Sequence, residues 1–350
     1  MVQLTGRRRS LFTIIVLCLG VCVVLIGFEL LLRVTGHAPW KYEVLDRHEP
    51  TVHEPDSILG WRNKEGVYTV PPYVRGGEAI YVTFLEHGRR ATGPYNHDAK
   101  KEVVIVGDSF TQGWAISDAE TYSWKLQQRY PSMKVHNYGT GGYGTYQSLL
   151  VLERELPRLE SPALVIYGFF YHNEVRNVAD DEWLRILSSY SKRAHVFLPY
   201  GSVDHDGRLV RHAPERYVAL PFHEKSATVA YIENLYMRMT AHGRGEYKRA
   251  VTEAILVEMN RFWEKYNAKF IVTILNADDD TTAHYKAFLE RSRIPLVDCN
   301  YPLTEQMRVP GEGHPNGHMN SLWAECIPVS YTHLRAHETK ANLVCRLLLE

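Results

Sequence analysis

Ser109 and His314 are the residues of this sequence whose surroundings could support nucleophilic chemistry. Ser109 lies in the block Gly107-Asp108-Ser109-Phe110, directly after four β-branched residues at 103–106. Such a run predicts a strand that is buried on both faces, as in a parallel sheet. A serine at the turn from this strand into a helix would hold its hydroxyl above the sheet edge, as a nucleophile requires. The alternative is a serine that only caps the helix.

An acyl-transfer site also needs a base, and a group that orients the base. His314, one of 17 histidines, lies in Gly313-His314-Pro315-Asn316 after the last predicted strand, where a loop can return to the first strand. We take His314 as the candidate base and Glu312 as the candidate orienting acid. The alternatives are a Ser–His dyad whose ring is oriented by a backbone carbonyl, or Asp298 as the acid. In either case Glu312 would be a solvated loop carboxylate.

Four blocks in this order resemble the SGNH (GDSL-type) serine hydrolases, and the resemblance covers residues 101–327. The blocks are Gly107-Asp108-Ser109-Phe110, the glycine-rich run 137–144, the run Gly168 to Glu174, and Gly311 to Asn316. The family commonly has Asp two or three residues before the histidine, whereas this chain has Gly311 and Glu312 there. It also has Glu174 after Asn173, where the family usually has Asp.

The resemblance implies an oxyanion hole with three donors. These are the backbone N–H groups of Ser109 and Gly142 and the side-chain amide of Asn173. A residue without a side chain at 142 would let the substrate oxygen approach closely. Asp108 is expected to brace the turn rather than to react. The aromatic residues Phe169, Phe170 and Tyr171 are expected to line the sheet edge and the pocket.

Strand and helix patterns alternate from residue 101 onward. This alternation predicts an α/β fold of the doubly wound, flavodoxin-like kind, a three-layer sandwich around a five-stranded parallel sheet. An interruption at 178–245 is expected to form an insertion or cap. The strands are expected at 103–106, 134–136, 163–167, 270–275 and 295–298, and the helices at 121–130, 146–156, 247–266, 282–291 and from about Met319.

The N-terminus has the pattern of a membrane anchor. A basic segment, 1–10, precedes a predicted anchor at 11–33, whose apolar run is interrupted only by Glu29 and ends at Arg33. About 20 such residues span a bilayer as a helix. The basic residues favour the cytoplasmic side for the N-terminus, which places the remainder outside the cytoplasm. The alternatives are a cleaved signal peptide or a lipoprotein signal ending at Cys22. We expect Glu29 to reach the membrane interface. We also expect a partly ordered stalk at 34–100, whose short strands pack against the main domain.

Residues 328–350 do not continue the preceding pattern, and they resemble a translated sequencing-library adapter. We therefore leave His333, His337 and Cys345 out of the chemistry. Cys18 and Cys22 lie in the apolar run, and Cys299 and Cys326 are expected to be buried free thiols, although they could pair in an oxidising compartment.

The composition excludes some classes of function. The 40 basic and 40 acidic residues balance, so no charge excess favours nucleic acid. No spacing predicts a metal or cofactor site, since the adjacent carboxylates Asp278, Asp279 and Asp280 follow a strand and would diverge. We therefore expect no cofactor and no metal.

These features together predict a membrane-anchored, extracytoplasmic serine esterase that forms an acyl-enzyme on Ser109. Its substrate would be a small-molecule or glycan ester, such as acylated carbohydrate or lipid of the cell envelope. An O-acyltransferase of polysaccharide modification would use the same residues. A non-catalytic carbohydrate-binding relative, with Glu312 as a sign of a degraded triad, is the alternative from a different class.

Overall fold

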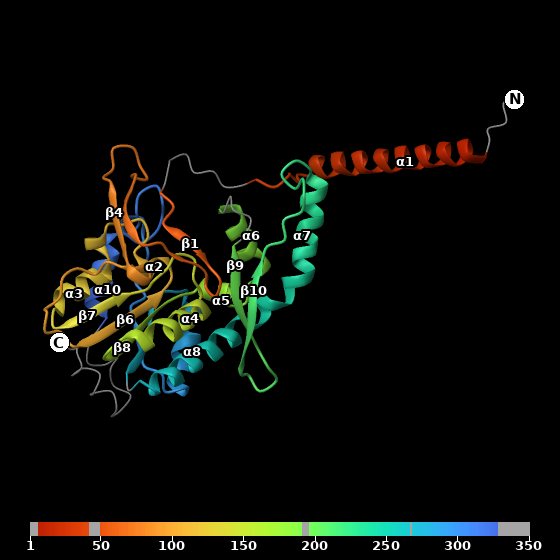
Figure 1. Cartoon of the computed structure of the whole chain (residues 1–350). Helices are drawn as coiled ribbons and strands as arrows, with labels where there is room; N and C mark the ends of the chain where they lie inside the picture. Colours follow the sequence, from red (N-terminus) through yellow and green to blue (C-terminus); the bar gives the residue numbers. More distant parts are fainter. Residues whose placement is uncertain (1–5, 42–49, 191–195, 267, 328–350) are drawn as a thin grey trace. The chain divides into compact units, whose positions relative to one another are not determined.

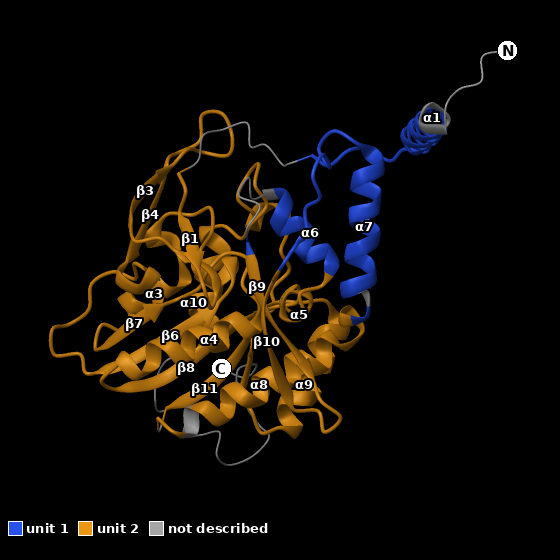
Figure 2. Ribbon diagram, turned by 45° about the vertical axis from the view of Figure 1, so that its right-hand side comes forward, with its two compact units in different colours: residues 1–44, 181–196, 216–243 blue, residues 45–180, 197–215, 244–350 orange. Residues whose placement is uncertain are grey.

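A computed structural model describes the chain except for residues 1–5, 42–49, 191–195, 267 and 328–350, so the adapter-like tail lies outside the described residues. The chain divides into two compact units, which Figure 2 colours separately. Unit 1 comprises 1–44, 181–196 and 216–243, and unit 2 comprises 45–180, 197–215 and 244–350. The predicted insertion at 178–245 is therefore divided between the two units.

Unit 2 is built on a sheet that has eight strands within the described residues, in the order β12-β11-β8-β6-β7-β5-β4-β3 (Figure 1). The strands are β3 (Gly66–Val70), β4 (Ile80–Leu85), β5 (Arg89–Arg90), β6 (Lys101–Gly107), β7 (Met133–Asn137), β8 (Pro162–Phe170), β11 (Lys269–Asn276) and β12 (Leu296–Asp298). From β12 to β7 the neighbours pair in parallel, which confirms the predicted parallel α/β sheet.

Helices of unit 2 cover both faces of this sheet. They are α2 (Ser109–Gln112), α3 (Tyr122–Arg129), α4 (Thr145–Glu155), α5 (Asn173–Asn177), α8 (Lys248–Glu264), α9 (Asp279–Arg291) and α10 (Gly317–Cys326). Val103 and Ile105 of β6 share an apolar cluster with Leu126 of α3 and Trp323 of α10. Because neighbouring strand residues point to opposite faces, Val104 and Val106 face the other side, where α4 contacts β6. Both faces of β6 are buried, as the β-branched run predicts.

Residues 50–100 of the segment in which we expected a stalk belong to unit 2. Strands β3, β4 and β5 extend the sheet beyond β7 in antiparallel pairing, and Arg90 of β5 pairs with Asn137 of β7. A separate hairpin joins β1 (His53–Asp56) to β2 (Gly60–Asn63). The alternation of apolar residues in 80–85 explains this placement, because Ile80, Val82 and Phe84 are the buried side of β4.

A second hairpin of unit 2, β9 (Phe197–Val203) and β10 (Leu209–Arg216), comes from the predicted insertion. Its strand β9 contacts α4, α5, α8 and β2. This hairpin therefore packs on elements of the unit that carries Ser109.

The prediction of free thiols at Cys299 and Cys326 is wrong, because these two residues form a disulfide. Cys299 follows β12, and Cys326 is the last residue of α10; their Cα atoms are 5.9 Å apart. The bond closes a loop with a sequence separation of 27 residues, and both Glu312 and His314 lie inside that loop.

Unit 1 contains α1 (Gly6–Val34), α6 (Asp181–Tyr190) and α7 (Ala227–Ala241). Residues Ser10–Val34 of α1 are long and apolar enough to cross a membrane. The carboxylate of Glu29, which we expect at the membrane interface, accepts hydrogen bonds from the backbone N–H groups of Ala227 and Thr228 at 2.9 and 2.8 Å. Free N–H groups at a helix start attract a carboxylate, so Glu29 caps α7.

We predict that the disulfide contributes substantially to the stability of unit 2. Replacing Cys299 and Cys326 together by serine removes the restriction of a 27-residue loop in the unfolded chain. The expected loss in the free energy of unfolding is about 3–4 kcal/mol. Chemical denaturation of the original and the double variant, each with and without reductant, measures it. Reductant should destabilise only the original protein. Equal stability of the original and the double variant in the absence of reductant would contradict the prediction.

Candidate active site

The turn that carries Ser109 is fixed by its own residues. Asp108 has an extended backbone and caps α2, since its Oδ1 accepts a hydrogen bond from the Phe110 backbone N–H at 3.0 Å. Gly113 ends the helix in the left-handed conformation. The sequence thus gives a strand, an abrupt turn and one helical turn, with Ser109 at the helix start.

Two glycines allow this turn to pack tightly against the sheet. A Cβ atom at Gly107 would lie 2.3 Å from the Thr111 hydroxyl oxygen, and a Cβ atom at Gly168 would lie at the same distance from it. Thr111 therefore lies between the ends of β6 and β8, where only glycine leaves room.

His314 and Glu312 form a continuous hydrogen-bond chain with Ser109. His314 Nε2 is 3.0 Å from Ser109 Oγ, and His314 Nδ1 is 2.7 Å from Glu312 Oε1. Glu312 Oε2 also accepts from the His314 backbone N–H at 2.8 Å, and the Trp114 indole N–H donates to Oε1 at 3.1 Å. The structure brings the predicted nucleophile, base and acid together, in the arrangement of an activated serine.

The carboxylate of Glu312 is held in its ionised form. Burial raises its pKa, but the hydrogen bonds and charge of His314 and the hydrogen bond from Trp114 lower it more, so that its pKa is below the usual value. A carboxylate with this pKa is negatively charged at neutral pH, and can stabilise an imidazolium.

The carboxylate of Asp298, the alternative acid, binds residues other than His314. Its Oδ2 pairs with Lys286 Nζ at 2.6 Å, and its Oδ1 accepts from the Asn300 backbone N–H at 3.1 Å. The carboxylate next to His314 is therefore that of Glu312.

The side chain of Arg176 connects the serine turn with two other blocks. Its Nη1 lies 3.0 Å from Asp108 Oδ2, 2.9 Å from the Tyr143 carbonyl oxygen and 3.3 Å from Asn173 Oδ1. Asp108 and Arg176 are both buried. Burial raises the pKa of Asp108, and the Arg176 guanidinium opposes that effect. One cation thus neutralises the buried carboxylate behind the nucleophile and contacts the glycine-rich block and α5.

The two remaining predicted oxyanion donors lie near this network. Asn173 begins α5 and is fully buried, with its side-chain N–H donating to the Tyr167 hydroxyl at 2.8 Å. Gly142 has φ +81°, a conformation that favours glycine. In the part of the chain that the structure describes, no hydrogen bond joins either residue to Ser109 or His314. Their oxyanion role stays a prediction.

The hairpin β1–β2 holds the glycine-rich loop. The Trp61 indole N–H donates to the Gly141 carbonyl at 2.9 Å, and Asn63 Nδ2 donates to the Gly139 carbonyl at 3.0 Å. In return, the Tyr143 hydroxyl donates to the Trp61 carbonyl. The loop is therefore not freely flexible, because the preceding segment binds it at three residues.

Gln112 links the same hairpin to the helix of the nucleophile. Its Nε2 donates to Asn63 Oδ1 at 2.8 Å and lies 3.5 Å from His53 Nε2. His53 stacks on Trp114 with ring centroids 5.9 Å apart. Burial lowers the pKa of His53 to about 4, so this ring is neutral at neutral pH and can accept the amide hydrogen.

The aromatic residues after β8 differ in their surroundings. Phe169 is completely buried against Tyr285, with ring centroids 4.6 Å apart. We expected it to line a pocket, but it belongs to the core. Phe170 stacks on Phe110, the neighbour of Ser109, at 4.4 Å. Tyr171 is partly exposed beside Phe170.

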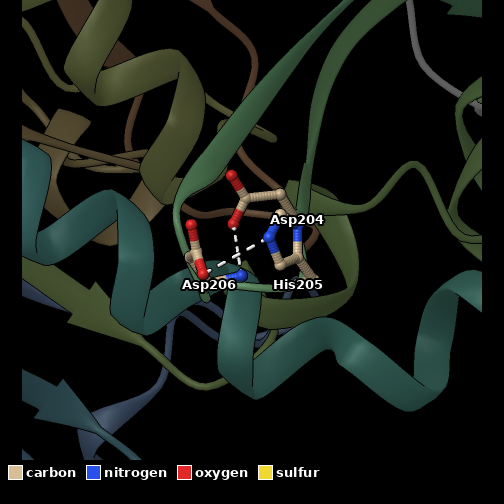
Figure 3. Close-up of side chains that lie close together, drawn as sticks. All are labelled: Asp204, His205 and Asp206. Atoms are coloured by element: carbon tan, nitrogen blue, oxygen red, sulfur yellow. Dashed lines mark hydrogen bonds and ion pairs between the residues drawn. The ribbon is translucent and has the colours of Figure 1, made fainter.

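Two acidic groups have structural explanations. Asp204, His205 and Asp206 cluster at the turn between β9 and β10 (Figure 3). Asp204 Oδ1 accepts from the backbone N–H groups of Asp206 and Arg208, each at 2.9 Å, which is the hydrogen bonding of a turn. In the other group, Asp278 caps α9 and Asp280 pairs with Arg249 at 2.6 Å.

Arg176, Trp114 and the hairpin residues Trp61 and Asn63 are not among the site residues predicted from the sequence. Arg176 follows Asn173 by three residues, which places both on one side of a helix. A buried Asp108 would also require a cation nearby. For Trp114 and Asn63 no comparable sequence signal exists, because their partners are distant in the chain.

No protein-family model and no curated protein matches this chain. Several solved structures match it. One is a member of the lipolytic G-D-S-L family from Veillonella parvula, with 13% identity and a TM-score of 0.38 over 66% of this chain and 98% of that one. Another is the psychrotrophic esterase EstA from Pseudoalteromonas, inhibited by monoethylphosphonate, with 11% identity and a TM-score of 0.38 over 64% and 95%.

We predict that the Trp61 indole N–H keeps the glycine-rich loop in place. The variant Trp61→Phe retains an aromatic ring and loses the bond to Gly141, which should weaken the loop by about 1 kcal/mol and speed amide exchange around Gly141 and Gly142 roughly fivefold. Hydrogen exchange followed by mass spectrometry measures this.

Trp124→Phe is the matched control, because the Trp124 indole nitrogen is buried without a hydrogen-bond partner among the described residues. That control should leave exchange in the loop unchanged. Equal exchange rates in both variants would show that the Trp61 bond does not hold the loop.

Proposed function

We propose that this chain is a serine ester hydrolase of the SGNH type. The observation that carries the proposal is the hydrogen-bond chain Ser109 Oγ, His314 Nε2, His314 Nδ1 and Glu312 Oε1, at 3.0 and 2.7 Å. A hydroxyl within reach of an imidazole, itself oriented by a carboxylate, is the arrangement that makes serine nucleophilic.

In the proposed reaction His314 accepts the Ser109 proton while Oγ attacks the ester carbonyl carbon. The negative charge on the carbonyl oxygen is stabilised by the backbone N–H groups of Ser109 and Gly142 and by the Asn173 amide. The bond to the alcohol then breaks, and His314 gives its proton to the leaving oxygen. In the second half-reaction His314 accepts a proton from water while the water oxygen attacks the acyl carbon. The bond to Ser109 Oγ then breaks and His314 returns the proton to Oγ, which releases the acid and restores Ser109.

We infer further that the enzyme is held at a membrane by α1, with unit 2 outside the cytoplasm. The apolar span at Ser10–Val34 supports the anchor, and the three arginines at 7–9 support this orientation. The disulfide between Cys299 and Cys326 supports an oxidising compartment. Acylated carbohydrate or lipid of the cell envelope is the substrate class that such a location favours.

An O-acyltransferase of polysaccharide modification is the second candidate, since it would use the same acyl-enzyme and a sugar hydroxyl in place of water. The two are distinguished by adding a sugar acceptor to a reaction with an acyl ester. A hydrolase continues to release free acid, whereas a transferase moves the acyl group to the acceptor. A non-catalytic carbohydrate-binding relative is disfavoured, because Glu312 contacts His314 as an orienting acid would.

We predict that a fluorophosphonate probe labels Ser109 of the folded protein, with displacement of fluoride by Oγ. Ser109→Ala should abolish both labelling and hydrolysis of a short p-nitrophenyl ester. Ser321→Ala is the control, because the Ser321 hydroxyl donates only to the Gly317 carbonyl, within α10. Mass spectrometry locates the adduct. An unlabelled original protein, or a label that persists in Ser109→Ala, would contradict the enzyme assignment.

We also predict the effect of removing the charge of Glu312. Glu312→Gln keeps the shape of the side chain but not its attraction for an imidazolium, so kcat should fall by on the order of 10³.

Steady-state rates of hydrolysis of the same p-nitrophenyl ester test this expectation. Glu305→Gln, in a short helical turn of the same disulfide loop, is the control and should leave kcat unchanged. An unchanged kcat in Glu312→Gln would mean that a Ser–His dyad suffices.

A further inference from the structure

Helix α7 of unit 1 carries an exposed apolar stripe. Its members are spaced so that 231, 235 and 239, and likewise 232 and 236, lie above one another on one face of the helix. The exposed side chains are those of Tyr231, Ile232, Leu235, Tyr236 and Met239. A contiguous exposed apolar stripe of this kind is typical of a surface that binds another protein or a membrane.

The opposite face of α7 is fixed within unit 1. Glu233 is completely buried and accepts hydrogen bonds from the Tyr217 hydroxyl at 2.8 Å and from His223 Nδ1 at 3.0 Å. Met237, one turn further on, is buried as well. Rotating the helix to cover the stripe would expose Met237 and break the bonds of Glu233, so the stripe stays outside.

The start of α7 is attached to the outer end of α1. Besides the backbone N–H groups of Ala227 and Thr228, Glu29 accepts from the Ser226 hydroxyl at 2.8 Å and from Arg33 Nε at 2.7 Å. Glu29 lies five residues before Val34, the end of the apolar helix, which corresponds to about 7.5 Å along the axis. The N-terminus of α7 is thus held at the depth of the last turns of the span.

The stripe lies on the side of α7 that contacts α1. The ring of Tyr231 meets Phe28 of the apolar span edge to face, with centroids 6.3 Å apart. Figures 1 and 2 show α7 running across the axis of α1 and not alongside it. A helix that crosses a membrane-spanning helix at its end runs along the membrane plane, and the stripe continues from Tyr231 along that plane.

We propose that this stripe is a membrane-binding surface whose occupant is the phospholipid bilayer that α1 spans. This inference rests on the membrane anchoring in the proposed function. Tyr231 and Tyr236 lie at the headgroup level, where amphipathic rings are favoured, and Ile232, Leu235 and Met239 enter the acyl boundary. The protein is then attached by a spanning helix and an interfacial helix, with Glu29 joining the two.

The test places a photoreactive benzoylphenylalanine at single positions of the full chain in vesicles of phosphatidylethanolamine and phosphatidylglycerol. The positions are Met239 in the stripe, Leu17 in α1 and Val67 on β3, which are 79%, 63% and 78% exposed. Met239 and Val67 are matched in exposure, so reactivity alone does not distinguish them. We expect phospholipid adducts at 239 and 17, at least tenfold above those at 67, by mass spectrometry after irradiation.

Each other outcome overturns a defined part of the argument. Adducts at 17 without adducts at 239 leave the anchor in place and reject the membrane surface on α7. No lipid adduct at either position rejects the anchor, and with it the inference. Equal adducts at 239 and 67 mean non-specific contact with vesicles. A cross-linked dimer at 239 in place of lipid shows that a second copy of the chain covers the stripe.

Discussion

The buried ion pair between Asp108 and Arg176 is the interaction on which the candidate site depends. A carboxylate in a buried turn is tolerated only with a paired cation, and removing one partner of such a pair costs about 3–5 kcal/mol. Asp108 also caps the helix of Ser109, while Arg176 contacts the Tyr143 carbonyl and Asn173. The requirement to neutralise one carboxylate therefore fixes the serine turn, the glycine-rich loop and α5 relative to one another.

The base and its acid are supplied by a separate part of unit 2. Glu312 and His314 lie in a loop after β12, between the two cysteines of the disulfide. Within that loop the Val309 N–H donates to the His314 carbonyl at 2.7 Å, and Arg308 Nη1 donates to the Gly313 carbonyl at 2.8 Å. The disulfide limits where the loop can go, and these local bonds set the direction of the imidazole. The candidate site therefore combines the Ser109 turn, which a buried ion pair holds, with the loop of Glu312 and His314, which a disulfide restrains.

Features set by neighbouring residues could be predicted from the sequence, whereas features set by contacts between distant residues could not. The strand at 103–106 and the Ser109 turn were predictable, because β-branched runs and glycines act on the local backbone. Residues 66–70 and 80–85 were recognisable as strands, yet their place at the edge of the main sheet depends on pairing with β7 through Arg90 and Asn137. The links from Trp61 to Gly141 and from Trp114 to Glu312 span 80 and 198 residues. No local pattern encodes such pairs.

Glu29 and the two cysteines of the disulfide also have partners that are distant in the chain. An ionisable residue in an apolar span signals a partner, but the partner of Glu29 is the start of a helix almost 200 residues away. The sequence is compatible both with a disulfide between Cys299 and Cys326 and with two free thiols. The disulfide forms because the end of β12 and the end of α10 are adjacent in the fold.

The glutamate at 312, one methylene longer than the aspartate expected from the family resemblance, is accommodated by the shape of its loop. Gly311 and Gly313 have φ values of +78° and +97°, so the chain folds tightly around Glu312. The carboxylate then curls back, with one oxygen on the His314 backbone N–H and the other on Nδ1 of the same residue. The extra length is taken up by this return path. Trp114, in the segment that follows Ser109, donates its indole N–H to Oε1 of Glu312, the oxygen that also contacts Nδ1. The acid is therefore connected to the nucleophile both through the imidazole and through the indole.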